Sequence, residues 1–145
     1  MLAKVPKKDV PQFESAVRKY RRKVLLPTQM PFVVTKVSAF SATILGPGPH
    51  SPTQYMLTAQ YSNPTKDLVV EESIELFGSG GAMKGDGQAV KLKHASKAWF
   101  FKDSATTVLN WDANGLYYML TDANHSNPNW LSRAKMVKIA NSMSY

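Results

Sequence analysis

The chain has 145 residues, a net charge of +8 and 43% hydrophobic residues. This length suits one domain with a core of its own, and the apolar content excludes a disordered chain. No stretch approaches the roughly 18 consecutive apolar residues of a membrane-spanning helix. The chain has no cysteine, which excludes disulfides, thiolate zinc sites and cysteine nucleophiles.

The positive charge is concentrated near the N-terminus. Residues 1–23 contain eight Lys or Arg against two Asp or Glu, which gives a net charge of +6. The rest of the chain contains ten Lys or Arg against eight Asp or Glu, which gives only +2. The sequence therefore predicts a nearly neutral body with a cationic N-terminal arm.

A helix is expected over residues 11–24 of this arm, with Asp9 as its cap. Apolar residues at helical spacing predict a face that docks on the body: Phe13, Val17, Tyr20 and Val24. Its cations have two interpretations, a solvated face that complements the helix dipole or a surface that binds anionic lipid or wall polymer. The candidate contact residues are Arg18, Lys19, Arg21, Arg22 and Lys23. Nucleic acid is not the expected partner, because the rest of the chain supplies no basic groove or recognisable motif.

Strands are expected along most of the middle of the chain. Residues 32–45 are rich in β-branched types, and strand composition continues at 53–62 and 68–78. The turn-forming sequences GPGPHSP and SNPTKD separate these segments. Further strands are expected within QAVKLKHASKAWFFKD, residues 88–103.

The segment VLNWDANGLYYML, residues 108–120, predicts a β-hairpin. Asn-Gly tolerates the positive φ that a tight turn requires, and strand-forming residues flank it. Alternation places Tyr117 and Met119 on one face of the sheet and Tyr118 and Leu120 on the other. Because both sets are largely apolar, both faces are predicted to be at least partly covered.

Candidate catalytic residues are few. Glu71 and Glu75 alternate along the strand at 68–78, but an exposed strand face gives the same spacing without any function. A hydrolase would require acid and base groups to converge in three dimensions, and the residues available for this are Glu71, Glu75, Asp112 and His94. The alternative is an apolar groove between sheet and helix, lined by Phe40, Tyr55 or Trp99, that binds lipid or peptide.

No cofactor or metal is expected. The glycine-rich loop GSGGAMKGDG fits neither a Walker A loop nor a dinucleotide fingerprint, which needs its third glycine where Met83 stands. The three histidines, His50, His94 and His125, are scattered and have no carboxylate at ligand spacing.

A C-terminal helix is expected after Ser132, a natural N-cap, with an apolar stripe of Met136, Val137, Ala140 and Met143. The predicted fold class is α+β, a twisted antiparallel sheet of about five to seven strands with N-terminal and C-terminal helices packed on one face. One domain spans 1–145: a basic helical arm (1–24), the sheet (25–128) and the C-terminal helix (129–145).

Residues 24–143 resemble the bacterial domain-of-unknown-function family numbered 4367. The resemblance rests on VLLPTQMPF, AVKLKHASKAWFF, TTVLNWDANGLYYML and WLSRAKMVKIANSM. The family pattern has a Pro-x-x-x-Pro start, a valine-containing strand, a Leu-x-Trp-x-x-x-Gly-x-x-Tyr hairpin and a terminal helix. The matching positions are Pro27, Pro31, Val90, Leu109, Trp111, Gly115, Tyr118, Leu131, Val137, Ile139, Ala140, Ser142 and Met143.

The resemblance implies a location outside the bacterial cytoplasmic membrane, after a signal peptide or lipoprotein anchor or behind the span of an anti-sigma factor. It also implies a sensory or interaction module. The chain departs from the family at KHAS, where glycine is often found, and it shows no anchor or anti-sigma part.

We therefore expect a non-enzymatic extracytoplasmic domain that binds a protein, lipid or envelope component, with the cationic helix facing the anionic envelope. The alternative is the hydrolase. Trp111, Gly115 and Tyr118 are expected to define the β-hairpin and its packing against the last helix.

Overall fold

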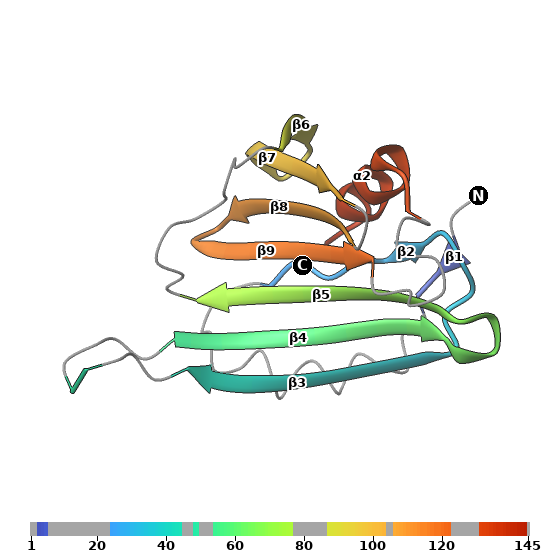
Figure 1. The fold of residues 1–145 in the computed structure, drawn as a ribbon, viewed down its shortest axis with the longest axis horizontal. Coiled ribbons are helices and arrows are strands. Elements are labelled where there is room, and N and C mark those ends of the chain that lie inside the picture. The colour runs from blue at the N-terminus through green and yellow to red at the C-terminus, as the bar shows by residue number, and fades with distance from the viewer. Residues whose placement is uncertain are drawn as a thin grey trace.

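A seven-stranded antiparallel sheet forms most of the protein in the computed structural model (Figure 1). The structure describes residues 3–5, 24–44, 48–49, 54–76, 87–103, 106–122 and 131–144. The strands are β3 (Lys36–Ile44), β4 (Gln54–Asn63), β5 (Leu68–Leu76), β6 (Gln88–Leu92), β7 (Ala95–Lys102), β8 (Thr107–Ala113) and β9 (Leu116–Asp122). Their order is β3-β4-β5-β9-β8-β7-β6, so two meanders meet where β5 pairs with β9.

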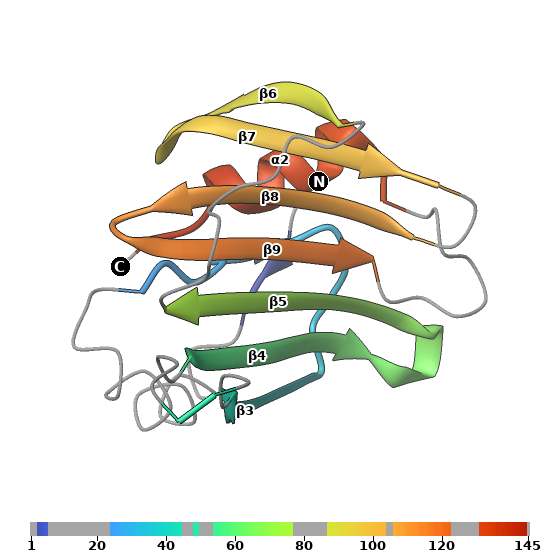
Figure 2. The same cartoon turned by 60° about the vertical axis from the view of Figure 1, so that its left-hand side comes forward.

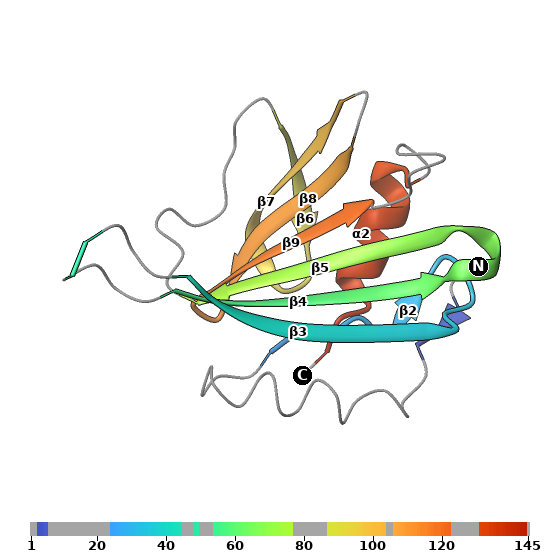
Figure 3. The same cartoon turned by 60° about the horizontal axis from the view of Figure 1, so that its bottom comes forward.

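The sheet is strongly twisted, and helix α2 (Arg133–Asn141) lies against one of its faces (Figure 3). Figure 3 shows β7 and β8 standing steeply against β3, β4 and β5, with α2 in the angle between the two halves. Strands β1 (Ala3–Lys4) and β2 (Gln29–Met30) pair as a separate two-stranded sheet. A 3₁₀ turn, η3 (Pro64–Lys66), joins β4 to β5. We call the sheet face toward α2 the inner face and the opposite one the outer face.

The predicted antiparallel sheet with a C-terminal helix on one face is confirmed, and its seven strands fall within the expected range. The described part of the chain is dominated by the sheet and contains α2 as its α-helix, rather than a clear α+β mixture. Of the helix expected over residues 11–24, residues 11–23 lie outside the described residues, and Val24 is buried but not helical. The pairing of β1 with β2 was not predicted, because two-residue strands carry no periodic signal.

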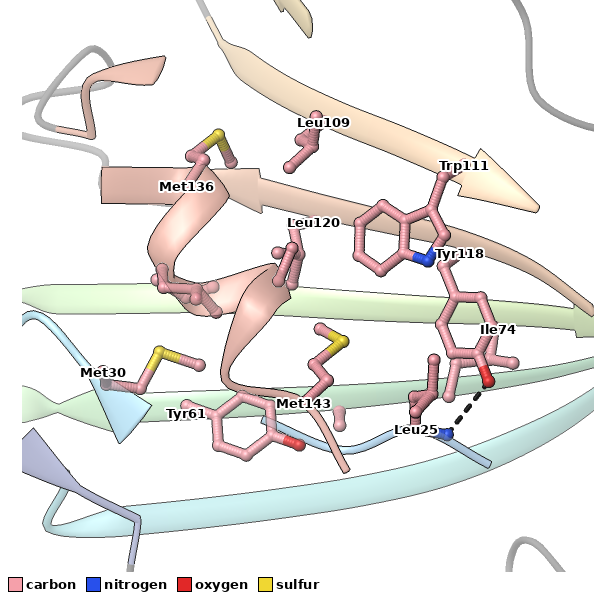
Figure 4. Packing of buried hydrophobic residues seen from close by; sticks show 14 of the residues in the cluster. Leu25, Met30, Tyr61, Ile74, Leu109, Trp111, Tyr118, Leu120, Met136 and Met143 are labelled. Carbon is pink, nitrogen blue, oxygen red and sulfur yellow. Dashed lines mark hydrogen bonds between the residues drawn. The ribbon is translucent and has the colours of Figure 1, made fainter. Parts of the chain in front are cut away.

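The core lies on the inner face because alternate residues of each strand point to it. In β9, Tyr118 and Leu120 are fully buried, whereas Tyr117 and Met119 are half-buried on the outer face. The expectation that both faces are partly covered is therefore confirmed for this strand. Figure 4 shows the inner-face core, in which Met136 of α2 lies near Leu109 and Leu120 of the sheet.

Trp111 and Tyr118 form the centre of the β8–β9 hairpin. They face each other in register, and their rings stack with centroids 5.4 Å apart. The hydroxyl of Tyr118 accepts a 3.0 Å hydrogen bond from the backbone N–H of Leu25 (Figure 4). At the turn, Asn114 and Gly115 have φ values of 51° and 75°, as a type I′ turn requires. The predicted hairpin is confirmed.

Helix α2 begins as the sequence predicts. The Ser132 hydroxyl accepts a hydrogen bond from the N–H of Lys135 at 3.2 Å and so caps the first turn. The buried residues of the helix are Met136, Ile139 and Ala140. Ile139 replaces Val137 in the predicted stripe, because positions three and four residues after Met136 share its face. Figure 2 shows α2 behind the β7–β9 part of the sheet.

Candidate functional site: a basic surface around β6 and α2

The arm residues predicted to contact an anionic surface, Arg18, Lys19, Arg21, Arg22 and Lys23, lie outside the described residues. Their role stays a prediction. The described part of the chain contains no helix that is long and apolar enough to cross a membrane.

The four residues proposed for a hydrolase lie in separate places. The carboxylate of Glu71 accepts a 3.0 Å hydrogen bond from the side-chain amide of Gln60. His94 is exposed in the turn between β6 and β7, and Asp112 is exposed on β8. The backbones of Glu75 and Asp112 pair with opposite sides of one β9 residue, so they lie two strand spacings, about 10 Å, apart. The structure brings none of Glu71, Asp112 and His94 into a shared cleft.

The aromatic residues proposed for a groove do not lie between sheet and helix. Phe40 is 54% exposed and Trp99 is half-buried, and both belong to the outer face, because their strand neighbours point into the core. Helix α2 packs on the inner face, so the predicted groove does not include these two side chains. Tyr55 lies within β4, and its side chain does not belong to the described part of the structure.

Glu72 is the titratable residue that the sequence analysis missed. It is completely buried on the inner face, where its Oε1 accepts a 3.2 Å hydrogen bond from the Tyr61 hydroxyl. Its Oε2 has no hydrogen-bond partner among the described residues. Burial raises the pKa of Glu72 to about 8, and burial followed by the charge of Glu72 raises the pKa of Tyr61 well above its usual value. This pair is enclosed in the core and so lies apart from any surface site.

A region of the fold that contains cations but no acidic residue is the second feature that sequence reasoning missed. Helix α2 and the stretch from β6 through β7 contain no Asp or Glu. Seven exposed cations lie on these elements, and six of them are grouped here: Lys91, Lys93, Lys97, Arg133, Lys135 and Lys138. We call these six residues the basic surface. Lys102 is left out because it stands next to Asp103 at the far end of β7.

The basic surface is assembled by α2 lying alongside the edge strand β6. At the start of both elements, Arg133 donates a 3.3 Å hydrogen bond to the side-chain carbonyl of Gln88. At their ends, the backbone N–H of Lys93 donates a 2.9 Å hydrogen bond to Oδ1 of Asn141. The helix and the strand therefore run in the same direction, and cations about 40 residues apart in sequence come together.

An open polar pocket of about 270 Å³ lies at the end of the basic surface. It is lined by Gln29, Lys93, Lys138, Asn141 and Ser142. None of these residues is acidic, and neither lysine forms an ion pair within the part of the chain that the structure describes. The pocket can therefore offer ammonium and amide donors to an anion.

Ordinary structural roles explain some of these cations but not the whole set. Lysine on an edge strand such as β6 discourages pairing with other chains, and Lys138 complements the dipole in the last turn of α2. Neither role requires that all acidic residues be absent from both elements. The described acids lie in or beside β5, β8 and β9 and in the β7–β8 turn. Among the described residues, no three acidic or histidine side chains form a group that could hold a metal.

Comparison with known proteins gave no match: no family model, no curated protein and no solved structure matches this chain. The resemblance to the domain family numbered 4367 stays a prediction.

Proposed function

We propose that this protein is a non-enzymatic interaction domain of the bacterial cell envelope that docks on the anionic membrane surface through its basic surface. The observation that carries the proposal is the segregation of charge, six exposed cations around β6 and α2 with no acid on those elements. A like-signed surface raises the local concentration of oppositely charged partners. The extracytoplasmic location comes from the family resemblance, and the basic arm would add to the same attraction.

The geometry supports docking with the β6 edge toward the membrane. The cations of α2 lie on the inner-face side of the β6 edge, and Lys97 lies near the same edge on the outer face, so the basic surface surrounds this edge from both sides. Each Lys or Arg near an anionic leaflet contributes about 1 kcal/mol, and the attraction fades within a Debye length, about 8 Å at physiological salt. Several such residues at one edge therefore suffice for reversible binding without an inserted apolar anchor.

Co-sedimentation with vesicles tests this proposal. We expect the full chain to sediment with vesicles of phosphatidylglycerol and phosphatidylcholine, to stay in solution with phosphatidylcholine alone, and to be released by salt. A variant with glutamine at Lys91, Lys97, Lys135 and Lys138 should lose most of this binding. A second variant with glutamine at Arg18, Lys19, Arg21, Arg22 and Lys23 measures the share of the arm.

The matched control removes three positive charges elsewhere on the body, at Lys36, Lys66 and Lys102, and should bind as the unchanged protein does. It is compared with a three-charge form of the first variant that keeps Lys97. Equal binding by the first variant and this control would overturn the assignment to the basic surface. Duplex DNA and purified wall polymer serve as competitors, and binding to either one in preference to vesicles would overturn the membrane as the partner.

A further inference from the structure

We infer that the pocket between β2, the β6–β7 turn and the end of α2 binds a phosphate group, free or as part of a headgroup. This inference deepens the proposed function, because it assigns a specific ligand class to one end of the basic surface. It rests on the proposed function only in one respect, that a lipid headgroup could be the source of the phosphate. Inorganic phosphate is the probe that tests the pocket itself.

The donors of the pocket are held by the fold. Asn141 is oriented because its Oδ1 accepts the 2.9 Å hydrogen bond from the N–H of Lys93. This bond occupies the acceptor side of the amide and leaves Nδ2, with its two N–H groups, to donate. No hydrogen bond of the Gln29 side chain or of Asn141 Nδ2 occurs within the described structure. The Asn141 amide is already oriented and therefore loses little conformational freedom when it binds.

The hydroxyl of Ser142 anchors the wall of the pocket. It accepts a 3.2 Å hydrogen bond from the N–H of Gln29 and donates to the carbonyl of Ile139 at 2.7 Å. The N–H of Ser142 lies 3.0 Å from the carbonyls of both Lys138 and Ile139. These bonds satisfy the carbonyls of Lys138 and Ile139 at the end of α2. They also fix β2 against the helix. The charges of Lys93 and Lys138 offset the negative end of the helix dipole, which by itself would oppose an anion.

The chemistry of the lining favours phosphate over a carboxylate ligand. Two exposed lysines, Lys93 and Lys138, supply compact positive charges, and the amides supply neutral donors around them. Lysine serves as a point-charge partner of phosphate, and a phosphate group with a charge of about −1.5 to −2 at neutral pH is attracted more strongly by two lysines than a singly charged carboxylate is. The pocket has no arginine and no acidic residue in its lining. Its volume of about 270 Å³ accommodates a phosphate with its attached group.

The experiment is an NMR titration of the ¹⁵N-labelled full chain with sodium phosphate at constant ionic strength, beside a titration with sodium acetate. We expect saturable shifts at the amides of Gln29, Lys93, Asn141 and Ser142 with phosphate, and a weaker response to acetate. Substituting Lys93→Gln together with Lys138→Gln should weaken phosphate binding about tenfold or more, because it removes both positive charges of the pocket.

Two further variants separate the pocket from general attraction. Asn141→Asp keeps an oxygen to accept from the N–H of Lys93 but replaces the donating Nδ2 with a negative oxygen, so it should abolish phosphate binding in a folded protein. Lys91→Gln with Lys97→Gln removes the same charge from the same hairpin outside the pocket and should leave phosphate affinity within about twofold. Amide shifts that do not saturate with phosphate would refute the proposed phosphate site. An equal loss of phosphate affinity in the Lys93/Lys138 variant and the Lys91/Lys97 variant would refute it as well.

Vesicle sedimentation of Asn141→Asp distinguishes the two sources of phosphate. Loss of both phosphate and vesicle binding identifies a headgroup as the ligand, whereas loss of phosphate binding alone identifies a free phosphate compound. Saturable phosphate binding without any vesicle binding would refute the proposed membrane docking and leave the pocket standing. Vesicle binding without saturable phosphate binding would refute the pocket alone.

Discussion

Glu72 lies in the least favourable environment for its residue type. Its carboxyl group is wholly buried among the strands β4, β5 and β9, with Tyr61 as the donor to Oε1 and no partner for Oε2. Its cross-strand neighbours are Ala59 and Leu120, which offer no charge to compensate a carboxylate. Because burial raises its pKa to about 8, the folded protein holds Glu72 as the neutral acid at neutral pH.

A defined pH dependence of stability follows. The unfolded chain releases this proton near pH 4.5 and the folded protein near 8, so the folded state binds more protons between these values. The contribution of Glu72 is therefore fully present below pH 4.5 and declines by up to roughly 1.4 kcal/mol per pH unit until about pH 8. Glu72→Gln should flatten this part of the profile in urea unfolding, and Glu71→Gln should keep it. An identical slope in Glu72→Gln would contradict the assignment.

The sequence could not reveal this residue. Both faces of β5 mix apolar and acidic residues, with Val69 and Glu71 on one side and Val70 and Glu72 on the other. Alternation predicts which residues share a face but not which face is buried. Burial is decided by β4 and β9, and the pairing of β5 with the distant β9 has no local signal.

The β8–β9 hairpin is the element that local sequence predicts best. Asn114 and Gly115 specify the turn type, and the register that follows places Trp111 against Tyr118 in a buried stack. Helix α2 is similarly predictable from its N-cap, whereas the two-residue strands β1 and β2 are not. Interactions between neighbours in sequence therefore account for the predicted elements, and contacts between distant segments account for the missed ones.

The turn gives a direct test at this scale. Gly115 has a φ of 75°, where a Cβ atom is unfavourable, so Gly115→Ala should destabilise the protein by about 1–2 kcal/mol. Asn114→Gly is the matched control, because glycine accepts the φ of 51° at that position, and its effect should stay within about 0.5 kcal/mol. Urea unfolding of both variants measures the difference. A loss in the control equal to that in Gly115→Ala would show that φ at residue 115 is not the cause.

At the scale of the molecule, the fold places the cations and the acidic residues of a nearly neutral body in different regions of the structure. The net charge of residues 24–145 is only +2, and this small number conceals the basic surface. The segregation arises because α2 lies beside β6, with hydrogen bonds at both of its ends, although the two segments are far apart in sequence. Composition predicted the cationic arm, but only the tertiary arrangement reveals a second cationic region.

The residues that follow α2 pair with the segment that precedes β3. The backbones of Leu26 and Ser144 exchange hydrogen bonds of 3.0 and 3.1 Å, and the Thr28 hydroxyl donates to the carbonyl of Ser142 at 2.6 Å. Between them, Met143 is only 2% exposed and packs in the core with Leu25. The last residues after α2 thus hold the segment before β3 against the inner face.

Met143→Ala tests how much this pairing stabilises the whole molecule. Truncating a buried methionine should cost about 2–5 kcal/mol and accelerate hydrogen exchange at the amides of Leu25 and Leu26, which the pairing protects. Ser144→Ala is the control, since Ser144 is exposed and pairs through its backbone, so its cost should stay within about 0.5 kcal/mol. If exchange at Leu25 and Leu26 were unchanged in Met143→Ala, the C-terminal residues would not be what holds this segment in place.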